Sequence, residues 1–177
     1  MAVLEPKNRD NLATILRSGQ NFGVKTVFVI GGFIREQYRG NVHKFSHQMN
    51  TQSALCEVAL LYFESLSEFL RHLPAQTTLV LVEMVQGAHP LERFEHPSNA
   101  TYLFGRETKG ITNADLELIR SYFVALQSEI PEPYRQGFRK TAHLVEVCID
   151  VPNSLNLGVC ASVVMYDRHA KRRQKIV

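Results

Sequence analysis

One turn of the chain indicates how the rest is organised: Leu103-Phe104-Gly105-Arg106-Glu107-Thr108-Lys109-Gly110-Ile111. An apolar run ends before its first glycine, two glycines bracket four polar residues, and Thr112 with Asp115 is typical of a helix start. Glycine permits positive φ and a close approach of the backbone to a ligand. Neither a Walker loop nor a GxGxxG fingerprint is present. The stretch therefore predicts a charged strand-to-helix turn suited to a nucleotide.

Strand and helix patterns alternate on both sides of this turn. Continuous apolar runs, typical of strands buried on both faces, lie at 26–30, 58–63, 79–82, 102–104 and 144–149. Helix signals begin at residue 8 or 10, at the capping box of Ser65 and Glu68, at 112, and at about 155 for a last helix toward 173. This alternation predicts an α/β three-layer sandwich with a mainly parallel sheet, in which ligands bind at the carboxyl ends of the strands.

Length and composition fit one domain over residues 1–177. An apolar fraction of 45% and a charged fraction of 21% exclude a disordered, collagen-like or coiled-coil chain. The apolar stretches are shorter than the ~20 residues that cross a bilayer, and the first residues do not resemble a signal peptide, so we expect a cytoplasmic protein. The segment 128–143, with two prolines and a glycine, breaks the alternation and is interpreted as a loop insertion.

The cysteines and histidines do not indicate a metal site. Cys56, Cys148 and Cys160 are odd in number and widely spaced, so buried free thiols are favoured over a disulfide framework or a zinc knuckle. His43 and His47 are four residues apart, but two histidines without a third ligand are usually surface residues. We therefore predict no metal.

Basic residues form three clusters on a chain whose net charge is only +3. Such clusters indicate local contacts with phosphates, and an ordinary solvated surface is the alternative for each of them. The candidate RNA-binding residues are Arg35, Arg39 and Lys44 in the first cluster and Arg135, Arg139 and Lys140 in the second, and the third cluster is 168–175.

The first predicted helix carries two polar residues of interest, Asn11 and Arg17. They are six residues apart and therefore lie on different faces of the helix. An arginine in an otherwise apolar helix needs an acidic or phosphate partner. A surface arginine whose stem covers the edge of the sheet is the alternative.

A third polar segment, Val151-Pro152-Asn153-Ser154-Leu155-Asn156-Leu157-Gly158, follows the last predicted strand. Its proline stops the strand, and Asn153 or Ser154 is predicted to cap the final helix. Ser154 and Asn156 then lie in the first helical turn, where free N–H groups favour anions. A cap without any further role is the alternative.

Together the three polar segments resemble the motifs of the SpoU family of SPOUT-class RNA ribose 2′-O-methyltransferases. The segment from Asn11 to Arg17 is similar to the first motif, and Phe104 to Ile111 is similar to the second, Phe-Gly-x-Glu-x-x-Gly. Ser154-Leu155-Asn156-Leu157 is similar to the third. The motifs occur in the family's order, and the resemblance covers almost the whole chain.

This resemblance implies a C-terminal trefoil knot, a pocket for S-adenosyl-L-methionine built from the knot loops, and a homodimer. It also implies methyl transfer to a ribose 2′-hydroxyl of RNA; we favour tRNA over rRNA because a minimal chain suits a compact substrate. The residues that it places around the cofactor are Glu83, Gly105, Ile149, Ser154 and Leu155.

The resemblance further implies that Arg17 acts on the ribose in the partner subunit's pocket. Arg17 is then either the base or, because guanidinium is very hard to deprotonate, an anchor for the target phosphate. Glu107, Ser154 and Asn156 would orient Arg17 and the ribose, and Asn11 would support the loop. Two alternatives stay open, a catalytically lapsed RNA-binding relative and a base methyltransferase of the same knotted class. The intact polar residues argue against the first, and the Ser-Leu-Asn motif argues against the second.

Overall fold

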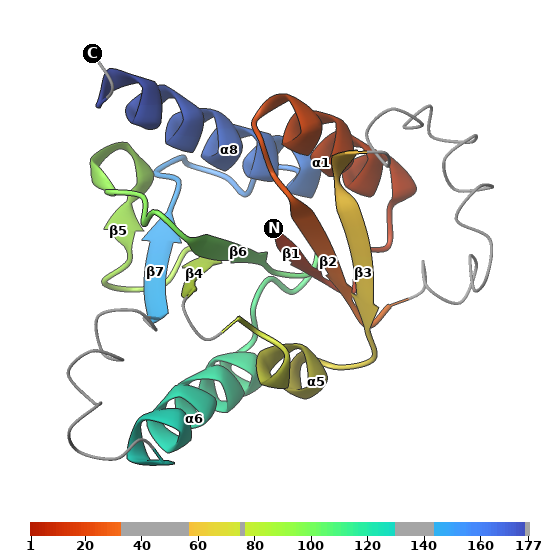
Figure 1. Ribbon diagram of the computed structural model, residues 1–177, viewed down its shortest axis with the longest axis vertical. Helices are drawn as coiled ribbons and strands as arrows, with labels where there is room; N and C mark the ends of the chain where they lie inside the picture. The colour runs from red at the N-terminus through yellow and green to blue at the C-terminus, as the bar shows by residue number, and fades with distance from the viewer. Residues whose placement is uncertain (33–56, 75–76, 130–143, 176–177) are drawn as a thin grey trace.

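A computed structural model describes residues 1–32, 57–74, 77–129 and 144–175. Within these segments one sheet runs through the molecule (Figure 1), with strands in the order β3-β2-β1-β6-β4-β7-β5. Every neighbouring pair is parallel. The strands are β1 (Ala2–Leu4), β2 (Thr26–Ile30), β3 (Ala59–Phe63), β4 (Thr78–Val82), β5 (His89–Pro90), β6 (Ala100–Phe104) and β7 (Leu144–Cys148).

Helices cover both faces of this sheet. Figure 1 shows α1 (Arg9–Asn21) and α8 (Leu157–Gln174) on one face and α5 (Leu66–Arg71) and α6 (Asn113–Glu129) on the other. A short 3-10 helix, η1 (Leu91–Arg93), follows β5. The arrangement confirms the predicted three-layer sandwich with a parallel sheet. None of the described helices has both the length and the apolar character to cross a membrane.

The inner strands read as continuous apolar runs because each of them contacts two cores. Successive strand residues point to opposite faces of a sheet. In β4, Val80 and Val82 belong to the core beneath α1 and α8, whereas Leu79 and Leu81 belong to the core beneath α5 and α6. All four side chains are buried. The interpretation of these runs as strands covered on both faces is confirmed for the inner strands. It was wrong for β3, which lies at the edge of the sheet and leaves Leu61 47% exposed.

Side-chain caps begin the helices at three of the predicted places. Asn8 is the N-cap of α1. The Ser65 hydroxyl accepts a bond of 3.1 Å from the Glu68 backbone N–H before α5. At α6 the Asp115 carboxylate accepts from the Thr112 N–H at 2.8 Å, and the Thr112 hydroxyl accepts from the Asp115 N–H at 3.3 Å. Each bond satisfies a backbone donor that the first helical turn leaves without a partner.

The predicted start of the last helix was wrong. Asn156 caps α8, not Asn153 or Ser154, because its side-chain oxygen accepts from the N–H groups of Gly158 at 2.9 Å and Val159 at 3.3 Å. Asn156 itself has an extended ψ of 139°. Ser154 therefore lies in the loop that precedes the helix, outside its first turn.

Two short strands were not predicted from the sequence, and one boundary differs from its prediction. Residues Ala2–Leu4 form β1, which lies between β2 and β6 and is at most 1% exposed. The two-residue β5 was also missed. Helix α6 continues to Glu129, so the first two residues assigned to the 128–143 insertion are helical. The rest of that segment lies outside the described residues, and the single domain and the trefoil knot stay predictions.

The N-terminal turns of α8 pack closely against α1. A Cβ atom on Gly158 would lie 3.0 Å from the Thr14 Cβ and 3.3 Å from the Asn11 carbonyl oxygen. One turn further on, the hydroxyls of Ser18 and Ser162 are 2.8 Å apart. These small side chains let the two helices approach, and they place the start of α8 beside the first motif.

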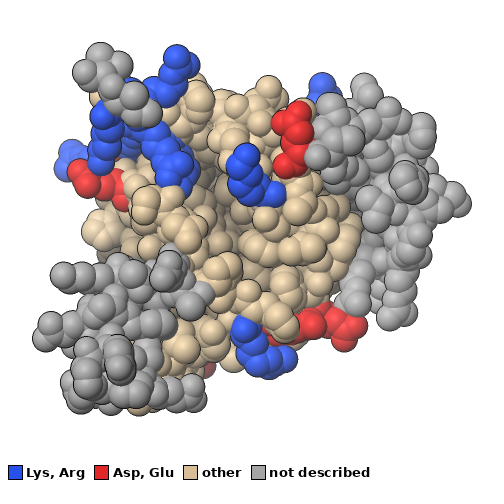
Figure 2. All heavy atoms as spheres, in the orientation of Figure 1, with Lys and Arg blue, Asp and Glu red and all other residues tan. Residues whose placement is uncertain are grey.

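Positive charge gathers where α8 ends. Figure 2 shows a group of Lys and Arg side chains around the C-terminal end of this helix. The third basic cluster, 168–175, lies in this part of the chain. The other two clusters, with the candidate RNA-binding residues Arg35, Arg39, Lys44, Arg135, Arg139 and Lys140, lie outside the described residues, as do His43, His47 and Cys56.

Candidate functional site

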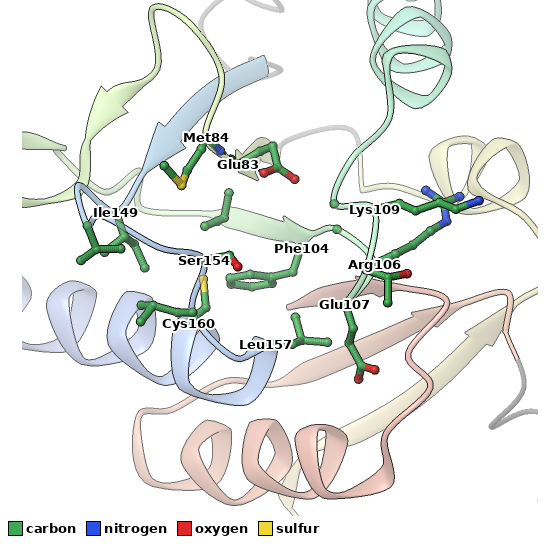
Figure 3. Close-up of a pocket in the computed structure, with 16 residues that line it drawn as sticks. Glu83, Met84, Phe104, Arg106, Glu107, Lys109, Ile149, Ser154, Leu157 and Cys160 are labelled. Carbon is green, nitrogen blue, oxygen red and sulfur yellow. Dashed lines mark hydrogen bonds between the residues drawn. The ribbon is translucent and has the colours of Figure 1, made fainter.

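A pocket of about 290 Å³ lies at the carboxyl ends of β4, β6 and β7, where ligands bind in open parallel sheets (Figure 3). Three loops form it: the residues after β4, the Gly105–Gly110 loop of the second motif, and the segment between β7 and α8. Apolar side chains from the strands and from α8 line its inner wall, among them Val82, Phe104 and Leu157.

All five residues predicted to surround a cofactor line this pocket: Glu83, Gly105, Ile149, Ser154 and Leu155. Glu107 lines it as well. Asn11, Arg17 and Asn156 are not among the lining residues. The structure thus brings the second and third motifs together around one cavity, and the roles of these residues stay predictions.

The Gly105–Gly110 loop folds back on itself. Arg106 and Gly110 exchange backbone hydrogen bonds of 3.0 and 2.9 Å. A Cβ atom on Gly105 would collide with the backbone of Gly110 and Ile111, and Gly110 has a φ of +61°. Both positions therefore require glycine, one for the close approach of two backbone segments and the other for its left-handed conformation.

Glu83 holds this loop from the neighbouring strand. Its carboxylate accepts one bond of 2.7 Å from the Ile111 N–H and another of 3.0 Å from the Met84 N–H. A side chain on Gly110 would collide with this carboxylate. Glu83 therefore fixes the shape of the pocket as well as lining it.

Arg106 was missed by the sequence analysis, and it anchors the loop on its other side. Its guanidinium donates to Asp115 at 2.6 and 3.3 Å and to Glu5 at 2.7 Å, and its side chain is only 17% exposed. The bonds to Glu5 and Asp115 raise the pKa of Arg106. Burial alone would raise the pKa of Asp115, but the bonds from Arg106 and Thr112 outweigh burial and lower it. A three-residue ion-pair group therefore ties the second motif to α6 and to the end of β1.

Glu107 joins the second motif to the first. Its Oε1 atom accepts from the Asn11 side-chain amide at 2.7 Å and from the Asn8 backbone N–H at 3.1 Å. In Figure 3 the Glu107 side chain points from the loop toward α1 and away from the middle of the pocket. Asn11 is 6% exposed. The expected support of the loop by Asn11 thus has a geometric basis, a bond between two motifs that are 96 residues apart.

Arg17 lies on the exposed side of α1, as its spacing from Asn11 predicted. Its carbonyl oxygen accepts from the Asn21 side chain at 2.7 Å. No carboxylate of the described residues lies within ion-pair distance of its guanidinium. Within one chain Arg17 therefore joins neither Glu107 nor the pocket.

The cysteine in the pocket wall is a poor nucleophile. Burial raises the pKa of the Cys160 thiol to about 11, with a smaller contribution from the negative charge of Glu83. The thiol therefore stays protonated at neutral pH. Cys148 and Cys160 are both free thiols. In the described segments no group of three His, Cys, Asp or Glu side chains is placed to hold a metal ion.

Comparison with solved structures shows the same fold in RNA methyltransferases. A protein studied for the 2-OH methylation of C/U34 on tRNA is 18% identical, with a TM-score of 0.65 and coverage of 98% of this chain and 95% of that one. The SpoU methyltransferase AviRb from Streptomyces viridochromogenes, solved with AdoMet, is 19% identical with a TM-score of 0.64. The A. aeolicus TrmH/SpoU tRNA modifying enzyme is 15% identical with a TM-score of 0.67.

These comparisons differ in how much of the relative they cover. This chain aligns over 98% of its length with AviRb and with the A. aeolicus enzyme, but it spans 61% of the first and 75% of the second. None of the curated proteins compared with the sequence matches it. The model of the SpoU rRNA Methylase family matches residues 1–129, which include the first two motifs and most of the pocket-forming strands. The chain therefore belongs to the SpoU rRNA Methylase family.

Proposed function

We propose that the protein transfers a methyl group from S-adenosyl-L-methionine to a ribose 2′-hydroxyl of RNA, and that tRNA is the favoured substrate over rRNA. The observation that carries the proposal is the pocket that the second and third motifs form at the carboxyl ends of the strands. Membership of an RNA methylase family supports RNA methylation. The AdoMet bound to AviRb supports the cofactor, and the relative studied for 2-OH methylation of tRNA supports the ribose target.

The residues of the pocket fit this cofactor. Its volume of about 290 Å³ is close to the lower end of the range for small-molecule sites. The apolar side chains of Val82, Phe104 and Leu157 offer a wall for a flat ring, and residues of the three loops complete the lining. When bound, S-adenosyl-L-methionine supplies an electrophilic methyl group. No metal takes part in the proposal.

The chain's own residues hold the site in shape and keep it from reacting with itself. Glu83 and Arg106 fix the two sides of the Gly105–Gly110 loop, so the pocket is formed before a ligand arrives. Ser154 presents a hydroxyl in the exposed loop of the third motif, where it would orient the ribose. The raised pKa of Cys160 keeps its sulfur from being a thiolate, which would compete with the ribose for the methyl group.

We infer that the active form is a homodimer in which Arg17 reaches the partner's pocket. The exposed position of Arg17, away from the pocket of its own chain, supports this arrangement. So does a row of exposed apolar side chains on and beside α8, large enough to contribute to an interface: Leu155, Val159, Val163 and Tyr166. Arg17 would act there as the base or as the anchor of the target phosphate.

The first experiment combines calorimetry with product analysis. We expect S-adenosyl-L-methionine to bind without RNA and in the presence of a chelator, and RNA digested after the reaction to yield 2′-O-methylated nucleosides. Base-methylated nucleosides would favour the base methyltransferase, and binding without transfer would favour the lapsed relative. Mass spectrometry of RNA from cells that lack the protein identifies the substrate RNA.

The second experiment tests the shared site. Arg17→Ala subunits and Asn156→Asp subunits are expected to be inactive alone, because each lacks one group that acts on the ribose. If a site combines Arg17 of one subunit with the third motif of the other, mixed dimers regain one complete site and activity returns. Confirmed mixed dimers without any activity would mean that each subunit carries its own site.

A further inference from the structure

A second cavity, of about 600 Å³, lies at the opposite ends of the strands from the first pocket. It opens where β1, β2, β4 and β6 begin, beneath the C-terminal half of α8. None of its described lining residues is acidic. Five of them are basic or histidine: Lys25, Arg168, His169, Arg172 and Arg173. This is the end of the molecule where Figure 2 shows Lys and Arg side chains gathering around the last turns of α8.

Arg168 is held in this cavity by neutral groups. Its guanidinium donates to the carbonyl oxygen of Pro97 at 2.7 Å, to the Tyr102 hydroxyl at 2.8 Å and to the carbonyl oxygen of Ser98 at 2.9 Å. It also lies 5.6 Å from the centre of the Tyr102 ring. These contacts fix its position and leave its positive charge without a carboxylate among the described residues.

Arg172 adds a second positive charge at the same place. Its guanidinium donates to the Ser98 carbonyl oxygen, which also accepts from Arg168. Burial, followed by the charge of Arg168, lowers the pKa of Arg172. Two guanidinium groups that share one carbonyl oxygen repel each other, and a bound anion relieves this repulsion.

The neighbouring Lys171 differs from these two arginines because it has a carboxylate partner. Its ammonium group forms an ion pair with Asp167 at 2.8 Å and donates to the carbonyl oxygen of Leu91 at 2.6 Å. Lys171 is thus neutralised and serves to attach α8 to the segment around η1. Two of the basic residues that line the second cavity, Arg168 and Arg172, have no such partner in the described part of the chain.

We propose that this cavity binds phosphate groups in the backbone of the substrate RNA, away from the site of methyl transfer; the inference rests on the proposed function. Guanidinium forks match pairs of phosphate oxygens, and a preordered arginine loses little freedom on binding. Cys160 in the first pocket and Arg172 in the second are twelve residues apart on α8, about 18 Å along the helix axis. One RNA molecule can therefore contact both ends of α8.

The expected effect follows from the salt dependence of such contacts. The slope of log K against log salt is negative, and each lost phosphate contact makes it shallower by roughly 0.7 to 0.9. At about 0.1 M salt, losing two contacts therefore weakens binding by roughly 25- to 60-fold. A substrate held only at the methyl-transfer pocket would show neither change.

The test measures binding of a tRNA transcript across a salt series. We compare the wild-type chain with the double variant Arg168→Gln/Arg172→Gln. The control is Arg71→Gln/Arg120→Gln, which removes the same charge from α5 and α6 on the other face of the sheet. We expect the first variant to lose about 1.4 to 1.8 units of slope and to raise KM for RNA, and the control to remain near the wild type.

A further variant guards against loss of structure. Arg168 anchors the segment of Pro97 and Ser98, so Arg172→Gln/Arg173→Gln is measured in parallel, because both of its positions are exposed. Calorimetric affinity for S-adenosyl-L-methionine reports that the fold is intact. The proposed phosphate site is overturned if RNA binding weakens equally in the variants and the control. It is also overturned if folded variants keep the wild-type salt dependence of RNA binding. A wild-type chain that binds no RNA, or never methylates it, overturns the proposed function instead.

Competition with inorganic phosphate distinguishes a site for the RNA backbone from a site for a free small anion. If the cavity serves RNA, millimolar phosphate competes only weakly, because a single anion lacks the several contacts of a polyanion. Tight binding of phosphate, with RNA binding that does not respond to the Arg168 and Arg172 substitutions, would assign the cavity to a small anion and overturn the inference.

Discussion

Replacing Glu107 by alanine removes the acceptor that joins the second-motif loop to α1. The Asn11 amide, in a residue only 6% exposed, then loses its partner, whereas the exposed Asn8 N–H gains water. A buried polar group left without a partner costs about 1–3 kcal/mol. Because Glu107 itself is exposed and water can enter, we expect a loss of about 2 kcal/mol, or roughly 4–8 °C in Tm for a chain of this length.

Two matched variants isolate this bond. Glu107→Gln retains an oxygen that accepts from both donors, so we expect it to cost about 1 kcal/mol or less. Asn11→Ala removes the same bond from the other side. Urea unfolding of both alanine variants and of their double variant completes a mutant cycle, and we expect a coupling free energy of about 1–2 kcal/mol between the two residues. Alanine substitutions whose effects add, or Glu107→Ala as stable as the wild type, would refute the structural role of the bond.

The same variants separate positioning from chemistry. If Glu107 acts by holding the Gly105–Gly110 loop, Glu107→Gln keeps most of the methyl transfer and the affinity for S-adenosyl-L-methionine, whereas Glu107→Ala loses both. If the glutamine variant is as inactive as the alanine variant but just as stable as the wild type, the negative charge itself is required. Glu107 would then act on the substrate or on the partner subunit's Arg17, and would not serve merely to hold the loop.

Three further expectations concern the rest of the site. Asn156→Asp keeps the oxygen that caps α8 and should retain stability while losing methyl transfer. Asn156→Ala should also lose about 1 kcal/mol in the free energy of unfolding, measured with urea. If the aspartate variant is as active as the wild type, Asn156 serves only as a cap. Gly105→Ala should disrupt the pocket because its Cβ would collide with the backbone of Gly110, and unchanged calorimetric binding would contradict this packing. The rate of Cys160 alkylation, followed by mass spectrometry, should keep rising with pH to about 11, since partial burial disfavours the thiolate. Levelling near pH 9, the ordinary thiol value, would contradict its position in the pocket wall.

Local patterns predicted most of the secondary structure. A strand buried on both faces requires an unbroken apolar run, as at Thr78–Val82, and a helix start requires a side chain that accepts from the first N–H groups, as Ser65 and Thr112 do. The positions of the polar loops at strand ends follow from the same alternation. The start of α8 was misplaced because Asn153, Ser154 and Asn156 are all good caps, and sequence alone does not choose among residues of equal capping ability.

By itself, the sequence determined the alternation of strands and helices and the three motif loops, because each depends on residues a few positions apart. The lining of the pocket was predicted from the resemblance to a known family. Only the tertiary structure decided which polar groups meet. Glu107 bonds to Asn11 across 96 residues, Arg106 to Glu5 across 101, and Arg168 to Pro97 across 71. Such pairs follow no local period, because the order of strands in the sheet sets them. The central position of the three-residue β1 was decided in the same way, since its burial comes from its neighbours on both sides.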